Sequence, residues 1–323
     1  MFADTDKLYY FDYASATPPS ASILNSFALN QEKWWTNTNS AHGLGLALTS
    51  KIDDQKKQLA SLLSVRAEYI NFFPSATICN NTAIFDIVNR VFHDGNKSIY
   101  YSPLEHPSII EPLFFWAKSM KVVLIEIPLK NEQLNFDTLE HNLDNIGAVI
   151  VSANMSGSGI LNDTNRLKNI LKGSNVLWHC DISSLVYNRL DNLGNFGPSH
   201  ITLSAKKIYG LDIAALITNG IHYSLIKSSN NFAGTPSYSL IYSFRQAVAE
   251  MTTHYAHGDH LAILRDKFED SLFGQEGIKI IGQKVPRLAN YSFLNLSQNK
   301  SDYIIYQLSK KKYYDWSRYS LQG

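Results

Sequence analysis

Lys206 and Lys207 are the residues whose surroundings most favour covalent chemistry. They follow the strand-like run Ile201–Ser204 and precede a Tyr-Gly turn. A lysine at the end of a buried strand loses part of its solvation. This loss lowers the pKa of the amine and makes it available to form a Schiff base with a carbonyl compound. The alternative is a pair of solvated loop cations, and this stretch taken alone favours that alternative.

Asp181 and His106 also stand at the ends of strand-like segments. Asp181 closes the apolar run Val176–Cys180, where an ionised carboxylate is costly unless it meets a partner. The alternative for Asp181 is a helix or turn cap. His106 precedes Pro107, a residue typical of the first turn of a helix. An imidazole there can transfer protons near neutral pH, and the alternative is a surface histidine at a helix start.

The segment Ser75–Thr77 stands where a strand is predicted to end and a helix to begin. The free amide groups of a helix N-terminus, together with a hydroxyl group, form a ready binding site for phosphate. The alternative is that Thr77 simply caps the helix, and the residues alone leave both possibilities open.

Together these segments resemble motifs of the cysteine desulfurases, which are class V aminotransferases that use pyridoxal 5'-phosphate (PLP). The string Ser-Ala-Lys-Lys-Ile-Tyr-Gly is similar to the family's Ser-Ala-His-Lys-Ile-Tyr-Gly, whose lysine carries the cofactor. Other family motifs recur in the expected order across nearly the whole chain. The matching segments are Tyr10–Pro18, Asn39–His42, Ser75–Asn81, Glu105–His106, His179–Asp181, Ser204–Gly210 and Gly234–Pro236.

The resemblance implies a role for each matching position. Lys207 forms the Schiff base with PLP, His106 stacks on the ring and moves protons, and Asp181 keeps the ring nitrogen protonated so that the ring acts as an electron sink. Lys207 and His106 are the expected catalytic residues. The expected cofactor-binding residues are Ala76, Thr77, His106, Ser156, Asp181, Ser184, Ser204, Lys206, Lys207 and Thr235. In the family, the loop matching Gly234–Thr235 reaches the phosphate of a second subunit, which implies a homodimer.

The chain departs from the family pattern at several positions. Lys206 replaces a histidine that reaches the phosphate, and Ser184 replaces a longer glutamine that contacts the ring oxygen. Desulfurases also carry a mobile cysteine that holds a persulfide, yet the corresponding region, Trp316–Leu321, has none. The chain stops before the position of the arginine that holds the substrate carboxylate in the family. We therefore expect either a truncated chain or chemistry other than desulfuration.

The composition is that of an ordinary globular protein. The 323 residues are 45% hydrophobic and 18% charged, and the formal net charge of +1 gives no electrostatic reason to expect nucleic acid or an anionic membrane as partner. The N-terminus lacks the features of a signal peptide, and no apolar run reaches the roughly 18 residues of a membrane span. Two cysteines without Cys-x-x-Cys spacing favour a reducing, cytoplasmic location. The cluster His254, His257, Asp259 and His260 is not assigned as a metal site, because Gly258 is expected to interrupt its helix.

Strand-like and helix-like segments alternate through the first two thirds of the chain, which predicts a mostly parallel, helix-covered sheet with ligands at the carboxyl ends of its strands. The predicted strands are 8–11, 69–73, 98–102, 122–127, 148–153, 176–181, 201–204, 214–218, 277–281 and 290–296. The predicted helices are 51–63, 80–91, 107–120, 136–143, 165–171, 240–254, 260–272 and 302–309.

The alternation predicts an α/β fold, and the family resemblance implies that it is of the PLP-dependent transferase, aspartate aminotransferase-like type. Residues 14–245 are expected to form the large PLP-binding domain. Residues 1–13 and 246–323 are expected to form a small α+β domain that is incomplete at the C-terminus. The implied reaction removes sulfur from L-cysteine and leaves alanine, with a sulfur-acceptor protein as a possible partner. Two alternatives stay open: another class V aminotransferase or lyase reaction on a small amino acid, and a degenerate homologue that acts as a binding partner.

Overall fold

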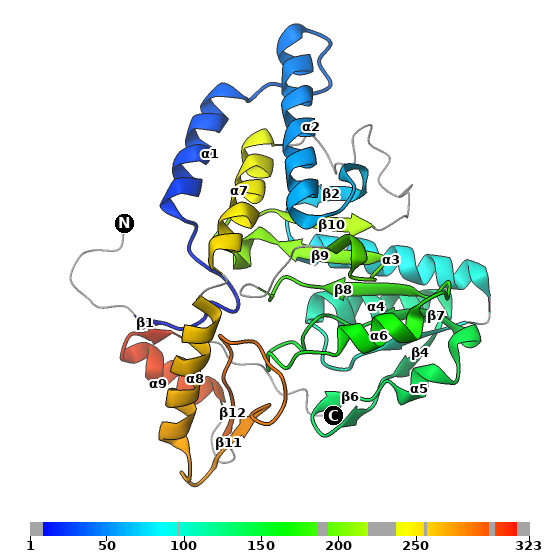
Figure 1. Cartoon of the computed structure of the whole chain (residues 1–323), viewed down its shortest axis with the longest axis vertical. Helices are drawn as coiled ribbons and strands as arrows, with labels where there is room; N and C mark the ends of the chain where they lie inside the picture. The colour runs from blue at the N-terminus through cyan, green and yellow to red at the C-terminus, as the bar shows by residue number, and fades with distance from the viewer. Residues whose placement is uncertain are drawn as a thin grey trace.

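A seven-stranded sheet forms the centre of the computed structural model, which describes residues 9–95, 97–185, 193–218, 237–254, 257–296 and 301–314 (Figure 1). The strands lie in the order β2-β10-β9-β8-β7-β3-β4. Only β10 runs antiparallel to its two neighbours, so the predicted mostly parallel sheet is confirmed. Their bounds are β2 Ile70–Phe73, β3 Ser98–Tyr101, β4 Val123–Glu126, β7 Ile146–Ile150, β8 Leu177–Asp181, β9 His200–Ser204 and β10 Ala214–Thr218.

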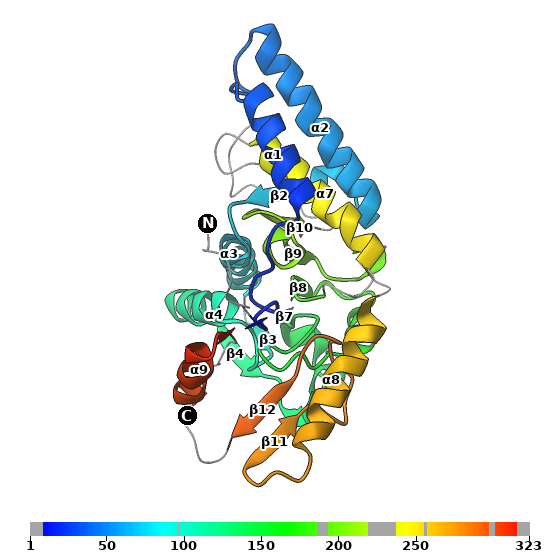
Figure 2. The ribbon, with the colours of Figure 1, turned by 90° about the vertical axis from the view of Figure 1, so that its left-hand side faces the viewer.

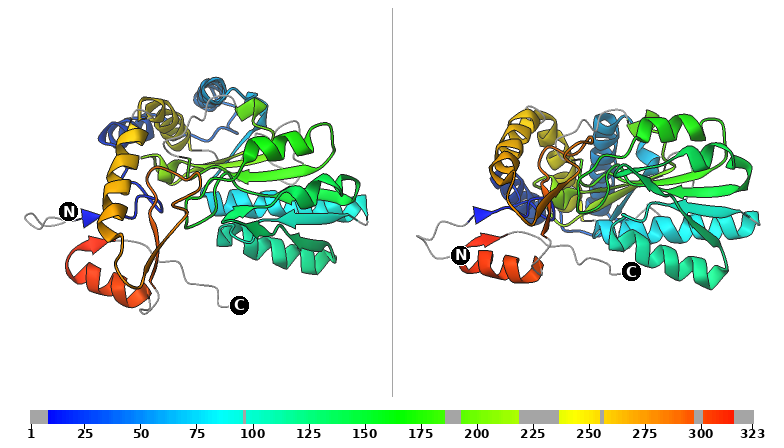
Figure 3. Two further views of the ribbon diagram at one scale, coloured as in Figure 1. Left: turned by 60° about the horizontal axis from the view of Figure 1, so that its bottom comes forward. Right: turned by 90° about the horizontal axis from the view of Figure 1, so that it is seen from below.

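The central strands are apolar on both faces because helices cover both. Along β7, Val149 packs into one core cluster while Ala148 and Ile150 pack into another on the opposite face, the alternation expected of a strand. Helices α3 (Ala76–Asp94) and α4 (Pro107–Met120) cover one face, and α6 (Thr164–Leu171) lies on the other (Figure 3). The short elements β5 (Leu129–Lys130), β6 (Gln133–Leu134) and α5 (Asp137–Glu140) lie between β4 and β7 in the chain.

Three helices extend from the β2 end of the sheet (Figure 2). Helix α7 (Tyr238–His254) packs against both α1 (Ala21–Lys33) and α2 (Gly43–Leu63). The sequence predicted only the second half of α2 and did not predict α1. The reason is that α1 buries a single apolar residue, Ile23, and contacts α7 through hydrogen bonds such as that from Ser26 Oγ to Gln246 Oε1 at 2.6 Å.

The remaining elements form a smaller group beside the sheet (Figure 1). Strands β11 (Ile278–Ile281) and β12 (Phe293–Leu296) pair antiparallel, flanked by α8 (Gly258–Leu272) and α9 (Ser301–Lys310). Strand β13 (Tyr313–Tyr314) pairs with β1 (Tyr9–Tyr10), which joins the two ends of the described chain. The domain boundaries stay a prediction, and α7 runs continuously across residue 245. None of the described helices is long and apolar enough to cross a membrane.

Candidate active site

A cavity of about 490 Å³ lies at the carboxyl ends of β2, β3, β7, β8 and β9. This is where ligands bind in open α/β sheets. Nine of the ten predicted site residues line it, and Thr235 lies outside the described residues. The predicted residues on its wall are Ala76, Thr77, His106, Ser156, Asp181, Ser184, Ser204, Lys206 and Lys207.

Lys207 reaches the cavity from a short 3-10 turn, Ala205–Lys207, that directly follows β9. Thr17 fixes this turn: its hydroxyl donates to the carbonyl of Lys206 at 2.9 Å and accepts from the amide of Tyr209 at 2.7 Å. Tyr209 itself is held in the left-handed region at φ +60°, which turns the chain sharply after the lysine. The Nζ atom of Lys207 donates to Ser184 Oγ at 3.2 Å.

Burial lowers the pKa of the Lys207 amine, and the charges of Asp181 and Asp12 only partly oppose this effect. Lys206 is in a different environment. Its side chain is 52% exposed and pairs with Asp212 at 3.1 Å. The buried amine of depressed pKa is therefore that of Lys207, whereas Lys206 lines the same cavity with a half-exposed side chain paired to Asp212. From the sequence alone, a buried amine of depressed pKa and a pair of solvated loop cations were both possible.

Asp181 holds its carboxylate at the end of β8 with two hydrogen bonds. The Nδ2 atom of Asn80 donates to Oδ2 at 2.9 Å, and the amide of Ser183 donates to Oδ1 at 2.8 Å. Burial alone would raise the pKa of Asp181, but the charge of Lys207 and these hydrogen bonds outweigh burial and lower the pKa. The carboxylate is therefore ionised at neutral pH and can hold a proton on a basic nitrogen in front of it.

His106 is the N-cap residue of α4. Its Nδ1 atom accepts from the amide of Ser108 at 3.1 Å and lies 2.8 Å from Ser108 Oγ. The neutral imidazole therefore carries its proton on Nε2. Ser108 Oγ also accepts from Asn80 Nδ2 at 2.9 Å, and the same Nδ2 atom contacts Asp181. A hydrogen-bonded chain thus connects the histidine to the carboxylate. Neither Asn80 nor Ser108 was assigned a role from the sequence.

The N-terminus of α3 faces the same cavity. Its cap is Ser75, whose Oγ accepts from the amide of Ile78 at 3.4 Å, so the alternative that Thr77 caps this helix is wrong. The first amides of α3, from Ala76 and Thr77, have no partner inside the helix and lie at the cavity wall. An anion such as phosphate is favoured at this position because the helix dipole and the amides act together.

Both cysteines of the sequence are buried. Burial raises the pKa of Cys79 in α3 well above its usual value, and the charge of Asp181 adds to the effect. The pKa of Cys180 in β8 is raised in the same way, by burial and by the charges of Glu105 and Asp181. Because the thiolate is the nucleophile, neither cysteine is suited to attack a substrate.

The residues that line the cavity suit PLP. The group needs an amine of depressed pKa, an acid for its ring nitrogen and donors for its phosphate, and Lys207, Asp181 and the start of α3 supply these in one cavity. Within the described ranges, no three His, Cys, Asp or Glu side chains gather as metal ligands.

Residues 9–219, more than half of the chain, match the family model Aminotransferase class-V. A selenocysteine lyase of Xenopus laevis is 22% identical over 88% of this chain and 76% of its own length. The cysteine desulfurase IscS of Dictyoglomus turgidum is 26% identical over 62% of this chain, and the match spans about half (51%) of that protein. A solved structure titled NifS-like protein has a TM-score of 0.87 at 20% identity and covers 97% of this chain and 88% of its own.

A second NifS-like structure, from Rickettsia africae, superposes with a TM-score of 0.84 at 20% identity over 97% of this chain and 88% of that chain. At such identity a structural match establishes the fold alone, and it confirms the predicted PLP-dependent transferase fold. The family match and the curated relatives confirm the resemblance to the cysteine desulfurase family.

Proposed function

We propose that this chain, which belongs to the class V aminotransferase family, binds PLP through Lys207 and removes sulfur from L-cysteine, leaving alanine. The observation that carries the proposal is the convergence of Lys207, Asp181 and the N-terminus of α3 on one cavity. When bound, PLP supplies an electron sink for carbanions formed next to it. Asp181 would hold the protonated ring nitrogen, and Ala76, Thr77 and Ser204 would hold the phosphate.

The chain's own residues would handle the protons. Because burial lowers the pKa of the Lys207 amine, the amine loses its proton more readily, which would favour condensation with the cofactor and action as a base afterwards. His106 presents Nε2–H because Ser108 occupies its Nδ1 atom, so it can give or take a proton at that atom. Full desulfuration also requires a thiol that accepts the sulfur atom, forming a persulfide while cysteine becomes alanine. We propose that this thiol comes from outside Cys79 and Cys180, for example from a sulfur-acceptor protein, and that the enzyme is a homodimer.

The two buried cysteines favour a second candidate, a class V reaction that needs no protein thiol. Elimination from cysteine would release sulfide, ammonia and pyruvate without a reductant. Desulfuration would give alanine, with sulfide released only when a thiol reductant is added. Product analysis therefore separates the two reactions: alanine supports the first, and pyruvate supports the second.

Cofactor binding is tested by reconstitution with PLP, borohydride reduction and peptide mapping. We expect the label on Lys207, loss of the label in Lys207→Ala, and a retained label in the matched control Lys206→Ala. A protein that stays colourless with added PLP would contradict the proposal and support a degenerate homologue. The variants Cys79→Ser and Cys180→Ser are expected to keep any activity, because neither thiol is accessible as a nucleophile.

A further inference from the structure

Tyr291 bounds the cavity on the side of the smaller group of elements. It comes from the loop between β11 and β12 and is only 9% exposed. Among the described residues that line the cavity, it is the only one that follows residue 213, and the sequence predicted no role for it. Burial raises the pKa of its phenol, so the side chain is neutral near pH 7. It therefore gives this wall a shape without adding a charge.

The loop that carries Tyr291 is fixed from both sides. On the side of the large sheet, the amide of Leu288 donates to the carbonyl of Gly159 at 2.8 Å, and the amide of Leu161 donates to the carbonyl of Pro286 at 2.9 Å. Gly159 has φ +71°, and a Cβ atom there would lie 2.5 Å from the Cβ and Cγ atoms of Tyr291. The tyrosine side chain therefore packs directly on the glycine backbone and has no room to move back.

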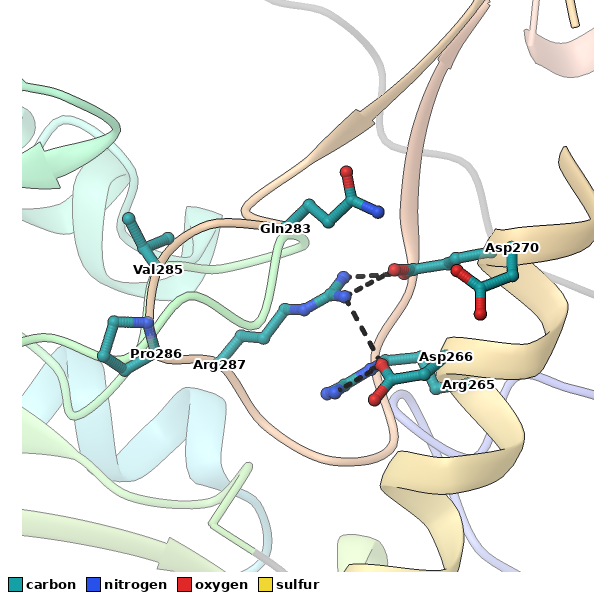
Figure 4. Close-up of a pocket in the computed structure, with 8 residues that line it drawn as sticks. Arg265, Asp266, Asp270, Gln283, Val285, Pro286 and Arg287 are labelled. Atoms are coloured by element: carbon teal, nitrogen blue, oxygen red, sulfur yellow. Dashed lines mark hydrogen bonds and ion pairs between the residues drawn. The ribbon is translucent and has the colours of Figure 1, made fainter. Parts of the chain in front are cut away.

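On the other side, helix α8 holds the loop through Arg287 (Figure 4). Arg287 Nη1 donates to Glu269 Oε1 at 2.6 Å, and a second hydrogen bond joins Nη2 to Oε2. Their side chains are only 6% and 2% exposed. Arg265 Nη1 adds a hydrogen bond of 3.0 Å to the carbonyl of Leu288. The position of Tyr291 is therefore set by contacts on both sides of its loop.

The cavity offers little space beyond that of the cofactor. Lys207, Asp181 and the first residues of α3, which are expected to hold PLP, all lie on the elements of the large sheet. The volume of about 490 Å³ must contain the cofactor and the substrate together. Pockets that bind a single ligand already measure about 300–1,000 Å³. The space that remains for a substrate is therefore small, and Tyr291 bounds it on the side away from the large sheet.

We propose that Tyr291 is a specificity-determining residue whose ring restricts the amino-acid substrate to a short side chain, an inference that rests on the proposed function. A closely packed wall that is held from two sides does not yield to a longer side chain without strain. L-Cysteine and L-alanine have short side chains and meet this limit, whereas a longer linear side chain meets the ring. The selection is by size, because the phenol is neutral.

The test measures the dissociation constants of L-alanine, L-2-aminobutyrate and L-norleucine from the change in visible absorbance of the PLP-loaded protein. These ligands share the amine and the carboxylate and differ only in the length of the side chain. The wild type should bind L-alanine more tightly than L-norleucine. Tyr291→Val widens the cavity, so the preference for L-alanine should fall at least about tenfold, since a single methylene group changes selectivity by about 10–200-fold. Tyr291→Phe should keep the wild-type preference, because it keeps the ring.

Tyr238→Val is the matched control, because Tyr238 is 6% exposed and does not line the cavity; its preference should equal that of the wild type. Tyr291→Leu, which keeps more of the packing against Gly159, replaces Tyr291→Val if that variant does not fold. With PLP bound on Lys207, an unchanged preference, an equal weakening of all the ligands, or a wild type that does not discriminate would overturn the inference. A wild type that takes up no PLP, or that binds none of these amino acids, would instead overturn the proposed function.

Discussion

The buried ion pair between Glu269 and Arg287 should be one of the most costly polar contacts to break in this protein. Substituting Glu269→Ala leaves the guanidinium of Arg287, which is 6% exposed, without its bidentate partner. Removing one member of a buried pair costs about 3–5 kcal/mol because an uncompensated charge stays in the interior. Asp266 Oδ1 lies 3.8 Å from Arg287 Nη2 and is 56% exposed, so it can compensate in part. We therefore expect a loss of about 3 kcal/mol, at the low end of that range.

The assay is urea unfolding followed by circular dichroism, with the free energy of unfolding compared between variants. Asp54→Ala is the control, because Asp54 and Lys57 form a pair at 3.9 Å that is 59% and 72% exposed. Exposed pairs contribute less than about 1 kcal/mol. A double variant, Glu269→Leu with Arg287→Met, should recover most of the lost stability, since it removes both charges together.

Two results would refute this reasoning. One is a Glu269→Ala variant that loses no more stability than Asp54→Ala, which would mean that α8 does not hold the loop through this pair. The other is a double variant that is less stable than Glu269→Ala, which would mean that the charges are needed for more than mutual compensation. A PLP titration of the double variant would then show whether the Tyr291 loop has moved.

Three further outcomes follow from the same contacts. Gly159→Ala should cost about 1–3 kcal/mol because the added Cβ atom overpacks against Tyr291. The control is Gly173→Ala, which should show only backbone strain, because Gly173 has φ +80° and nothing lies within 4 Å of its added Cβ atom. Urea unfolding measures the free energy of unfolding of both variants. Thr17→Val should cost about 1 kcal/mol by removing both hydrogen bonds of the hydroxyl, although the Lys206 carbonyl still accepts from the backbone amide of residue 17 at 3.0 Å, and it should slow PLP uptake as measured by absorbance. Burial lowers the pKa of His179 to about 3. Below about pH 6.5, therefore, His179 takes up a proton in the unfolded chain but not in the folded one. The free energy of unfolding should then fall by up to about 1.4 kcal/mol per pH unit as the pH is lowered. His179→Gln should flatten that slope between about pH 5 and about pH 6.5, and an unchanged slope would assign the effect to other groups.

The central sheet could be predicted because its strands are short apolar runs that end at polar residues. Strand β10, Ala214–Thr218, and helix α4, Pro107–Met120, were predicted with the bounds they have. Helix α4 begins at a proline and ends before Lys121, which adopts a left-handed conformation at φ +57°. Start and stop signals of this kind are local, and so they can be read from the sequence. Helix α1 gave no such apolar signal because Ile23 is its single buried residue.

The candidate site, like the fold, was predicted where the signal lies within a short segment and was missed where it depends on contacts between distant segments. The sequence placed Lys207, Asp181 and His106 at strand ends, and parallel strands bring their carboxyl ends to one edge. It did not reveal Tyr291, because that residue enters from a loop whose position depends on the Glu269–Arg287 pair. The fold adds a physical reason for choosing between the two adjacent lysines, because Lys206 is half exposed and paired with Asp212 at the cavity wall, whereas burial lowers the pKa of the Lys207 amine.

The positions of the two cysteines connect the fold to the chemistry. Cys79 lies in the first turns of α3, whose N-terminus faces the cavity, and Cys180 directly precedes Asp181 in β8. Each thiol is enclosed by the elements that hold the proposed cofactor-binding groups, and the nearby carboxylates raise its pKa further, in addition to burial. Exposing either thiol would disturb the α3 or β8 framework that positions the Asp181 carboxylate. A persulfide on Cys79 or Cys180 would thus compete with the proposed cofactor binding, so the proposed sulfur transfer would use a different thiol, whereas the alternative elimination would use none. The ratio of alanine to pyruvate, measured with and without added thiol, distinguishes these two mechanisms.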